Sequence, residues 1–161
     1  MVYPSRLPRA LTSQEIDNYR EGGAAVLRGV LSLSWIERMG RAVDCILANP
    51  GSASIEYTPK RHKGRYYGDF FVWLRDPDFK ALMMDSPLPE LAAQLMGSAS
   101  VSFFYDQLLV KEPGTEEPTP LHQDLRGCGP QRAPSVLSSS ATGYRAEPRP
   151  RPRDSCRFLA R

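Results

Sequence analysis

The chain reads YDQLLVKEPG at residues 105–114 and TPLHQDL at residues 119–125, and these two blocks decide the fold and the site that the sequence predicts. Residues 101–111 are the longest strand candidate, and the Pro-Gly pair that follows predicts a turn toward a second extended segment. In that segment His122 and Asp124 stand two positions apart. A strand points residues i and i+2 to the same face, so the imidazole and the carboxylate can bind one metal ion together.

A metal site built on these two residues has one ligand too few. The facial triad of non-haem Fe(II) sites combines one carboxylate with two histidines, and the second histidine comes from a distant strand. The sequence contains two histidines, and the other one, His62, lies upstream. A lone H-x-D pattern is weak evidence, so the pair gains specificity only from the strand and turn before it. The sequence therefore predicts weak or no iron binding by this chain alone.

The length of 161 residues suits a single domain, but the charge is divided along the chain. Residues 1–125 carry 13 Lys and Arg against 16 Asp and Glu. Residues 126–161 carry eight Arg, no Lys and two acidic residues. The basic balance therefore belongs to the last segment, and the protein as a whole is not expected to bind nucleic acid.

The sequence also predicts a soluble cytoplasmic protein that does not insert into membranes. No apolar run approaches the roughly 18 residues that a membrane span needs, and the N-terminus lacks the apolar stretch of a secretion signal. The three cysteines are odd in number and lack C-x-x-C spacing, which suits a reducing compartment.

Capping signals predict four helices before residue 100. The predicted starts are Thr12 with Glu15, Ser34 with Glu37, Asp76 with Pro77, and Ser86 with Pro87. The predicted ends include the glycine pair 22–23, the Asn-Pro-Gly run 49–51, and Gly97.

Short strands are expected at residues 24–28 and 66–73, and no regular structure is expected at residues 52–64. The basic run KRHK at residues 60–63 is interpreted as a solvated loop, with contact to an acidic substrate such as a coenzyme A phosphate as the alternative. Three aromatic residues are expected in the core: Phe70, Phe71 and Trp73.

Residues 1–125 resemble the phytanoyl-CoA dioxygenase family of Fe(II)/2-oxoglutarate-dependent oxygenases. The resemblance lies in the blocks LTSQE at 11–15, GGAAVL at 22–27, the Asp76–Pro77 helix start, QLLVKEPG at 107–114 and PLHQDL at 120–125. The last two blocks together are quite specific, whereas the H-x-D pattern alone is not.

The resemblance implies an α+β fold, namely a partial double-stranded β-helix, or jelly roll, with N-terminal helices packed on one sheet. It implies Fe(II) and 2-oxoglutarate as cofactors and a small organic or acyl molecule as the substrate that is hydroxylated. His122 and Asp124 match metal ligands, and Gln107 matches a position that often lies near cosubstrate or substrate. The alternative for Gln107 is the solvent face of an outer strand. No residue here matches the family's late histidine or the late arginine that pairs with 2-oxoglutarate.

The segment 126–161 departs from the family where further barrel strands are expected. It has five prolines, the run RPRPR at 149–153 and no sustained apolar period, so it is expected to be disordered. Arginine without lysine, among Pro, Gly, Ala and Ser, is what a GC-rich coding sequence yields in a wrong reading frame. We therefore hypothesise a frameshift or truncation near residue 126, which the gene sequence across that codon tests.

Three function hypotheses follow from these observations. The first is a dioxygenase family member that is incomplete and impaired in this chain. The second is a non-enzymatic truncated fragment with an open sheet edge. The third, which we favour least, is a binding module whose arginine-rich tail contacts phosphates of nucleic acid or of a membrane surface.

Overall fold

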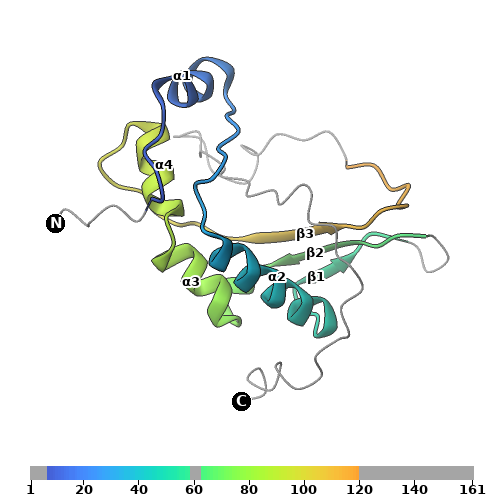
Figure 1. Cartoon of the computed structure of the whole chain (residues 1–161). Helices are drawn as coiled ribbons and strands as arrows, with labels where there is room; N and C mark the ends of the chain where they lie inside the picture. The colour runs from blue at the N-terminus through green and yellow to red at the C-terminus, as the bar shows by residue number, and fades with distance from the viewer. Residues whose placement is uncertain (1–6, 59–62, 120–161) are drawn as a thin grey trace. The chain divides into compact units, whose positions relative to one another are not determined.

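The computed structural model describes residues 7–58 and 63–119. In this part of the chain, helices and strands follow one another as drawn in Figure 1. The elements are α1 (Ser13–Gly22), α2 (Leu33–Ala48), β1 (Ser54–Glu56), β2 (Tyr66–Phe70), the 3-10 helix η1 (Val72–Leu74), α3 (Pro77–Asp85), α4 (Leu88–Met96) and β3 (Gln107–Lys111). This content confirms the predicted α+β class. The tail at 126–161, predicted to be disordered, lies outside the described residues.

Helix α1 begins and ends where the sequence predicts. The Thr12 hydroxyl accepts a hydrogen bond from the Glu15 N–H (3.2 Å), and the Glu15 carboxylate accepts one from the Thr12 N–H (2.9 Å). Arg9 donates to the same carboxylate at 2.6 and 2.9 Å, and mainly for this reason the pKa of Glu15 falls to about 2. Gly23 ends the helix in the left-handed conformation.

Helix α2 begins earlier than predicted, because Ser32 rather than Ser34 is its N-cap. The Ser32 carbonyl accepts hydrogen bonds from the N–H groups of Trp35 (3.1 Å) and Ile36 (3.2 Å), and its hydroxyl also accepts from Trp35. The Ser34 hydroxyl lies inside the first turn, 2.8 Å from the Ser32 hydroxyl. Two serines two positions apart offer the same capping chemistry, and the sequence did not distinguish them. The predicted end at Asn49 is confirmed.

Helices α3 and α4 follow their predicted signals closely. The Asp76 carboxylate accepts hydrogen bonds from the N–H groups at the second and third helical positions of α3, both at 2.9 Å, and Pro77 opens the helix. Ser86 then separates the two helices: its hydroxyl donates to a carbonyl of α3 and accepts from the Leu88 N–H (3.1 Å). Gly97 ends α4 in the left-handed conformation, as predicted.

Two predictions about irregular and extended segments are wrong. Residues 24–28 form no strand: Val26 is exposed, and the Arg28 carbonyl accepts hydrogen bonds from the Arg9 guanidinium at 2.6 and 2.8 Å. Residues 52–64, expected to be irregular, contain the short strand β1. A strand exists only where a partner strand supplies hydrogen bonds, and that partner is not visible in local sequence.

The described strands form an antiparallel sheet in the order β1-β2-β3. The register places Ile55 opposite Gly68 and Gly68 opposite Leu109. Strand β2 is shorter than the predicted strand at 66–73, because the backbone turns at Phe71 into η1. Strand β3 is also shorter than the predicted strand at 101–111, since regular pairing starts only at Gln107.

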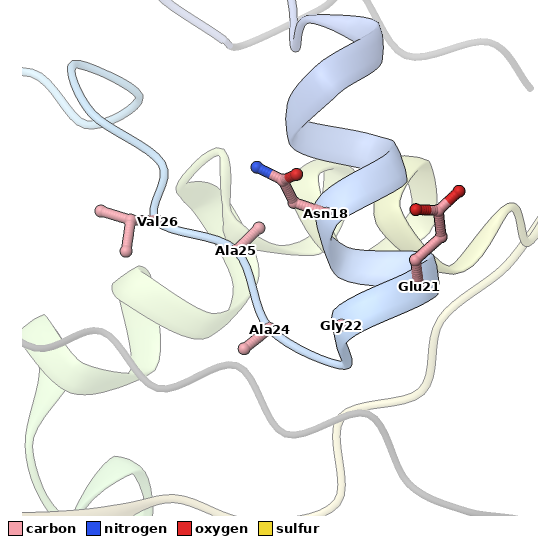
Figure 2. Close-up of a pocket in the computed structure, with 6 residues that line it drawn as sticks. All are labelled: Asn18, Glu21, Gly22, Ala24, Ala25 and Val26. Atoms are coloured by element: carbon pink, nitrogen blue, oxygen red, sulfur yellow. The ribbon is translucent and has the colours of Figure 1, made fainter.

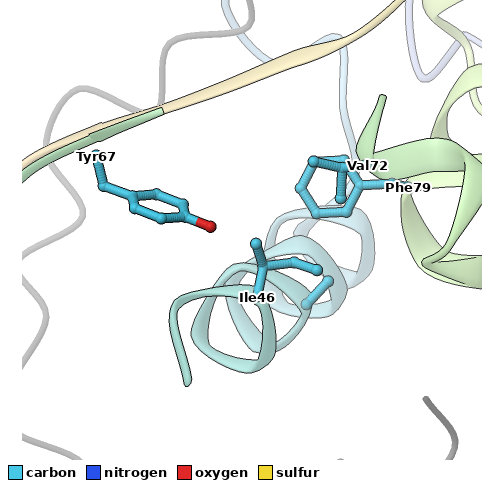
Figure 3. Packing of buried hydrophobic residues seen from close by; sticks show 5 residues of the cluster. Ile46, Tyr67, Val72 and Phe79 are labelled. Atoms are coloured by element: carbon cyan, nitrogen blue, oxygen red, sulfur yellow. The ribbon is translucent and has the colours of Figure 1, made fainter. Parts of the chain in front are cut away.

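Helices α2 and α3 lie along one face of the sheet, and the core fills the space between them (Figure 1). Figure 3 shows Tyr67 reaching from β2 toward Ile46 of α2, with Val72 and Phe79 beside them. Tyr67 is 1% exposed and Ile46 is fully buried. Full burial of a large apolar side chain stabilises the fold by about 1.5–3 kcal/mol. This cluster therefore anchors β2 to the helical layer.

The predicted core aromatics divide into two groups. Trp73 is partly buried and packs against the core cluster, and Phe70 is half-buried. The prediction for Phe71 is wrong, because its side chain is 48% exposed. No helix within the described ranges is both long and apolar enough to cross a membrane.

Candidate functional site

The predicted site residues begin on β3, whose side chains alternate between two environments. Leu108 and Val110 point toward the helices and pack against the core cluster. Gln107, Leu109 and Lys111 alternate with them and are exposed. The period of two along a strand explains the pattern. Gln107 therefore lies on the sheet face that α2 and α3 do not cover.

We call this second face the open face. It is defined by the residues that share a side with Gln107 through the strand register, namely Ile55, Tyr66, Gly68, Phe70, Gln107, Leu109 and Lys111, together with Tyr57, which stacks on Tyr66. Ile55 and Leu109 are 43% and 48% exposed, which is unusual for side chains of this size at the centre of a sheet. The open face is thus a largely apolar surface, with the Gln107 amide at one end of β3 and the Lys111 ammonium at the other.

Because Gly68 has no side chain, the open face is recessed at this position. A side chain at this position would approach the Tyr57 ring within 2.9 Å and the Leu109 side chain within 3.3 Å. Tyr57 lies over Tyr66 with 4.6 Å between ring centroids, and the Lys111 ammonium lies 5.2 Å from the centroid of the Tyr66 ring. These contacts bury Tyr66 while Gln107, at the far end of β3, remains exposed.

Asp106, immediately before β3, fixes the end of the sheet where Gln107 lies. Its carbonyl accepts a hydrogen bond from the Phe71 N–H (3.1 Å), and its carboxylate accepts from the Trp73 N–H (3.2 Å). The side chain is buried, and burial raises the pKa of this carboxyl above its usual value. Asp106 therefore joins β3 to η1 and holds the position of Gln107.

A second turn fixes the other end of β3, from which the chain continues toward His122. The Glu112 N–H donates to the Arg65 carbonyl (2.7 Å), and the Glu112 carboxylate accepts from the Arg65 N–H (3.0 Å). Gly64 lies against the turn so closely that a side chain would come within 2.4 Å of the Thr115 nitrogen. The end of β3 is therefore held against the start of β2, and the described residues end at Thr119, three positions before His122 in the sequence.

His122 and Asp124, the predicted metal ligands, lie outside the described residues, and so does most of the KRHK run at 60–63. Their roles stay predictions. Within residues 7–58 and 63–119, no group of three or more histidine, cysteine or acidic side chains is placed to hold a metal ion. Gln107 is placed on the open face, and its role near a cosubstrate also stays a prediction.

A hollow of about 690 Å³ lies between α1 and the loop that follows it (Figure 2). It is lined by Asn18, Glu21, Gly22, Ala24, Ala25 and Val26. Glu21 points away from the loop that carries the two alanines, so the polar groups do not converge. Binding sites combine apolar walls with a few convergent polar groups, and this hollow lacks the second feature. We assign it no function.

Sequence reasoning missed the buried carboxylates that organise this end of the sheet. Asp69 and Asp106 are both buried, and each accepts hydrogen bonds from other segments: Asp69 from Gly51 and Arg75, and Asp106 from Trp73. Their positions at alternate residues among aromatic and apolar neighbours were the available signal, since Asp69 shares the inward side with Tyr67. Nothing in the sequence predicted the left-handed backbone of Phe71, because glycine or asparagine usually occupies a position with this conformation.

The structure is that of an α+β protein in which helices cover one face of a β-sheet and leave the other face open. In the sequence, an H-x-D segment follows this sheet. A family model described as phytanoyl-CoA dioxygenase matches residues 19–140, about three quarters of the chain. The chain therefore belongs to the phytanoyl-CoA dioxygenase family, and the matched region contains the whole sheet, Gln107, His122 and Asp124. Searches of curated proteins and of solved structures gave no match.

Proposed function

We propose that this protein descends from, and retains part of, an Fe(II)/2-oxoglutarate-dependent dioxygenase that hydroxylates a small organic or acyl substrate. The observation that carries the proposal is the family match, because it spans β3, Gln107 and the H-x-D pair in one continuous region. The open face supports it as well. A largely apolar sheet surface that carries an amide and an ammonium group suits the wall of a site that binds an organic molecule.

The fold that we propose for the complete family domain is a double-stranded β-helix, of which β1, β2 and β3 form a part. Two features support this. The sheet is covered by helices on one face only, and the side chains at the centre of the other face, Ile55 and Leu109, are exposed and apolar. A second sheet that packed on the open face would bury them, as in other two-layered β structures.

His122 and Asp124 are the residues that would hold the metal ion. An imidazole and a carboxylate two positions apart fit two of the three ligand positions of a facial triad, and the described residues supply no third. When bound, Fe(II) activates dioxygen with 2-oxoglutarate as the co-reductant. The protein's own part is to position the metal through His122 and Asp124, to orient the cosubstrate or substrate through Gln107, and to exclude water with the apolar open face.

The same residues predict an impaired site. No residue of the sequence matches the late histidine or the late arginine of the family. Loss of an outer-shell partner costs about 10–100-fold in metal affinity, and loss of a direct ligand costs more. We therefore propose that iron and 2-oxoglutarate bind weakly to this chain. The odd number of cysteines supports a cytoplasmic location.

Anaerobic titration of the purified chain with Fe(II) and 2-oxoglutarate tests this function. The visible charge-transfer band of the complex reports binding, and succinate release in air reports turnover. We expect a weak band that His122→Ala and Asp124→Ala remove. His62→Ala is the matched control, because it removes the only other imidazole and should leave the band unchanged. A band that survives both ligand substitutions would contradict the assignment, and strong succinate release by the 161-residue chain would contradict the impairment.

A non-enzymatic fragment is the alternative, and the incomplete ligand set favours it. It predicts neither a band nor succinate at any Fe(II) concentration. The tail hypothesis predicts something different: retention on heparin that falls with added salt and disappears when residues 126–161 are deleted. The same deletion leaves the iron titration unchanged if the dioxygenase proposal is correct, because the tail contributes none of the assigned residues.

A further inference from the structure

Phe71 has a backbone conformation that its side chain does not favour. Its φ of 57° and ψ of 34° lie in the left-handed region, and it is the only residue other than glycine with positive φ among the described residues. A large side chain is strained there, because its Cβ approaches a carbonyl oxygen. The ring is 48% exposed, so core packing does not explain why a phenylalanine stands at this position. Strain of this kind is evidence for a functional role.

The left-handed turn places two consecutive rings on the open face. Phe70 lies opposite Gln107 in the strand register and therefore shares its face. In a regular strand Phe71 would point to the opposite face, toward the helices. Instead, its ring centroid lies 6.0 Å from that of Tyr105. Tyr105 is exposed and precedes Gln107 by two residues, just before β3 begins. Phe71 thus lies beside the segment that leads into Gln107.

Three exposed rings meet at this point, and we call them the aromatic corner: Phe71, Phe104 and Tyr105. Tyr105 also contacts Phe104, edge to face, with 5.3 Å between centroids. The three side chains are 48%, 70% and 40% exposed. The cation–π contacts found among the described residues involve Trp35, Tyr67 and Tyr66 and none of these three rings, and Gln107 follows Tyr105 by two residues.

Hydrogen bonds to the backbone around Phe71 hold the aromatic corner in place. The Phe71 N–H donates to the Asp106 carbonyl (3.1 Å), and the Phe71 carbonyl accepts from the Leu74 N–H (3.1 Å). The Asp106 carboxylate binds the Trp73 N–H, and Trp73 packs against the core cluster. These bonds fix the backbone on both sides of Phe71, so the backbone that carries the ring is already ordered before a ligand binds.

We propose that the aromatic corner is a subsite that holds a flat, uncharged aromatic group of the substrate by stacking beside the Gln107 amide. The proposal rests on the function proposed above, in which Gln107 faces the cosubstrate or substrate. It narrows the substrate class from small organic or acyl molecules to those that carry a ring.

The size of the aromatic corner argues for a small molecule. Aromatic side chains bury roughly 150–250 Å² each. At the exposed fractions given above, three rings offer less than half of the roughly 800 Å² that each partner contributes to a stable protein interface. A single ring system stacked on Phe71 and Tyr105, with one hydrogen bond to Gln107, fits the area and the lack of charge.

Titration of the full ¹⁵N-labelled chain with indole, without iron or 2-oxoglutarate, tests this subsite. We expect amide chemical-shift changes at Phe71, Tyr105 and Gln107, and smaller ones with cyclohexanol, which has no aromatic ring. Phe71→Asn should weaken indole binding by roughly two- to tenfold. It should leave the thermal midpoint unchanged or raise it, because asparagine tolerates the left-handed conformation. A ring with only a structural role would instead lower the midpoint when removed.

Two further variants sharpen the test. Phe71→Leu keeps an apolar side chain without a ring and should weaken indole binding like Phe71→Asn. Leu33→Ala removes a side chain that is 76% exposed on α2 and should leave binding unchanged. Shift changes confined to other regions, or full indole affinity in Phe71→Asn or Phe71→Leu, would overturn the proposal. So would sedimentation that shows a dimer lost in Phe71→Asn, since the corner would then be a contact between chains. Failure of the proposed dioxygenase function would appear in the iron titration and not in this one.

Discussion

The Tyr67 hydroxyl donates a 2.7 Å hydrogen bond to Oδ2 of Asp69, two residues further along β2, and both side chains are buried. The same carboxylate accepts a hydrogen bond from Arg75, which follows η1, and one from the Gly51 N–H (3.3 Å), which follows α2. One buried carboxylate therefore joins the central strand to the two segments that carry the helices. This network supports the sheet from the side opposite to the open face.

The ion pair between Arg75 and Asp69 predicts an unequal response to two arginine substitutions. Arg75→Met leaves the Asp69 carboxylate buried without its cationic partner, and we expect a loss of about 3 kcal/mol in the free energy of unfolding. Arg38→Met breaks the exposed pair with Asp78 (2.7 Å) and should cost about 0–1 kcal/mol. Urea denaturation of both variants measures the difference, and equal losses would contradict this account of Asp69.

The Tyr67 hydroxyl should ionise at a higher pH than an ordinary tyrosine hydroxyl. Burial first, and the hydrogen bond to Asp69 second, raise its pKa to about 12 from the usual 10. A raised pKa means that this group's contribution to stability is complete below pH 10 and is lost as the pH rises from 10 through about 12. Ultraviolet absorbance titration should therefore show one late tyrosinate, which Tyr67→Phe removes. Tyr57→Phe, at a half-exposed ring, is the control and should leave the late step in place.

Asp106 predicts a dependence of stability on acid pH. Its folded-state pKa lies above the usual 3.8, chiefly because it is buried. The folded protein therefore holds a proton more tightly than the unfolded chain does. The stabilising effect is complete below the usual pKa and declines as the pH rises through the raised value.

Asp106→Asn should remove this part of the pH dependence, because the amide oxygen can still accept from the Trp73 N–H but no longer titrates. The urea midpoint of the parent chain minus that of the variant, measured from pH 3 to pH 7, should fall as the pH rises, whereas the lowered pKa of Glu15 affects both chains alike. Asp17→Asn changes an exposed carboxyl on α1 and should leave the decline as it is. A parent curve that rises steadily over this range with the same slope in Asp106→Asn would contradict the prediction.

Gly64 should tolerate no side chain, whereas Gly29 should tolerate one more easily. Both have positive φ, 76° and 67°, so alanine is strained at either position. At Gly64 the added Cβ would also lie 2.4 Å from the Thr115 nitrogen and 2.7 Å from the Pro113 carbonyl oxygen, both backbone atoms. At Gly29 nothing lies within 4 Å. We expect Gly29→Ala to cost about 1 kcal/mol and Gly64→Ala several times as much, as measured by thermal unfolding. Similar midpoints for the two variants would show that the turn after β3 moves freely.

Local chemistry explains which predictions of the fold were correct. The capping box of Thr12 and Glu15 and the Asp76–Pro77 start are confirmed, because each signal and its hydrogen-bond partners lie within a few residues. Strand predictions were less accurate. Residues 24–28 have the composition of a strand but form none, while the polar segment 54–56 pairs with β2.

For the candidate site, too, the sequence was sufficient to predict some features and not others. The H-x-D pair and the strand before it pointed to the family that the match over residues 19–140 shows. The alternation along β3 was sufficient to group Gln107 with Leu109, but not to say which of the two groups faces the helices. The roles of His122 and Asp124 stay predictions because these residues lie outside the described part of the chain.

The sequence by itself determined most ends of the helices, the α+β class and the family, because capping motifs, periodicity and short sequence blocks act over a few residues. Only the tertiary structure decided which segments pair as strands, which face of the sheet remains open, and why Phe71 turns its ring toward Tyr105. Those outcomes depend on hydrogen bonds and packing between residues that are tens of positions apart, such as the bond between Phe71 and Asp106. Contacts of that range are set by the whole fold, and local propensity gives way to them.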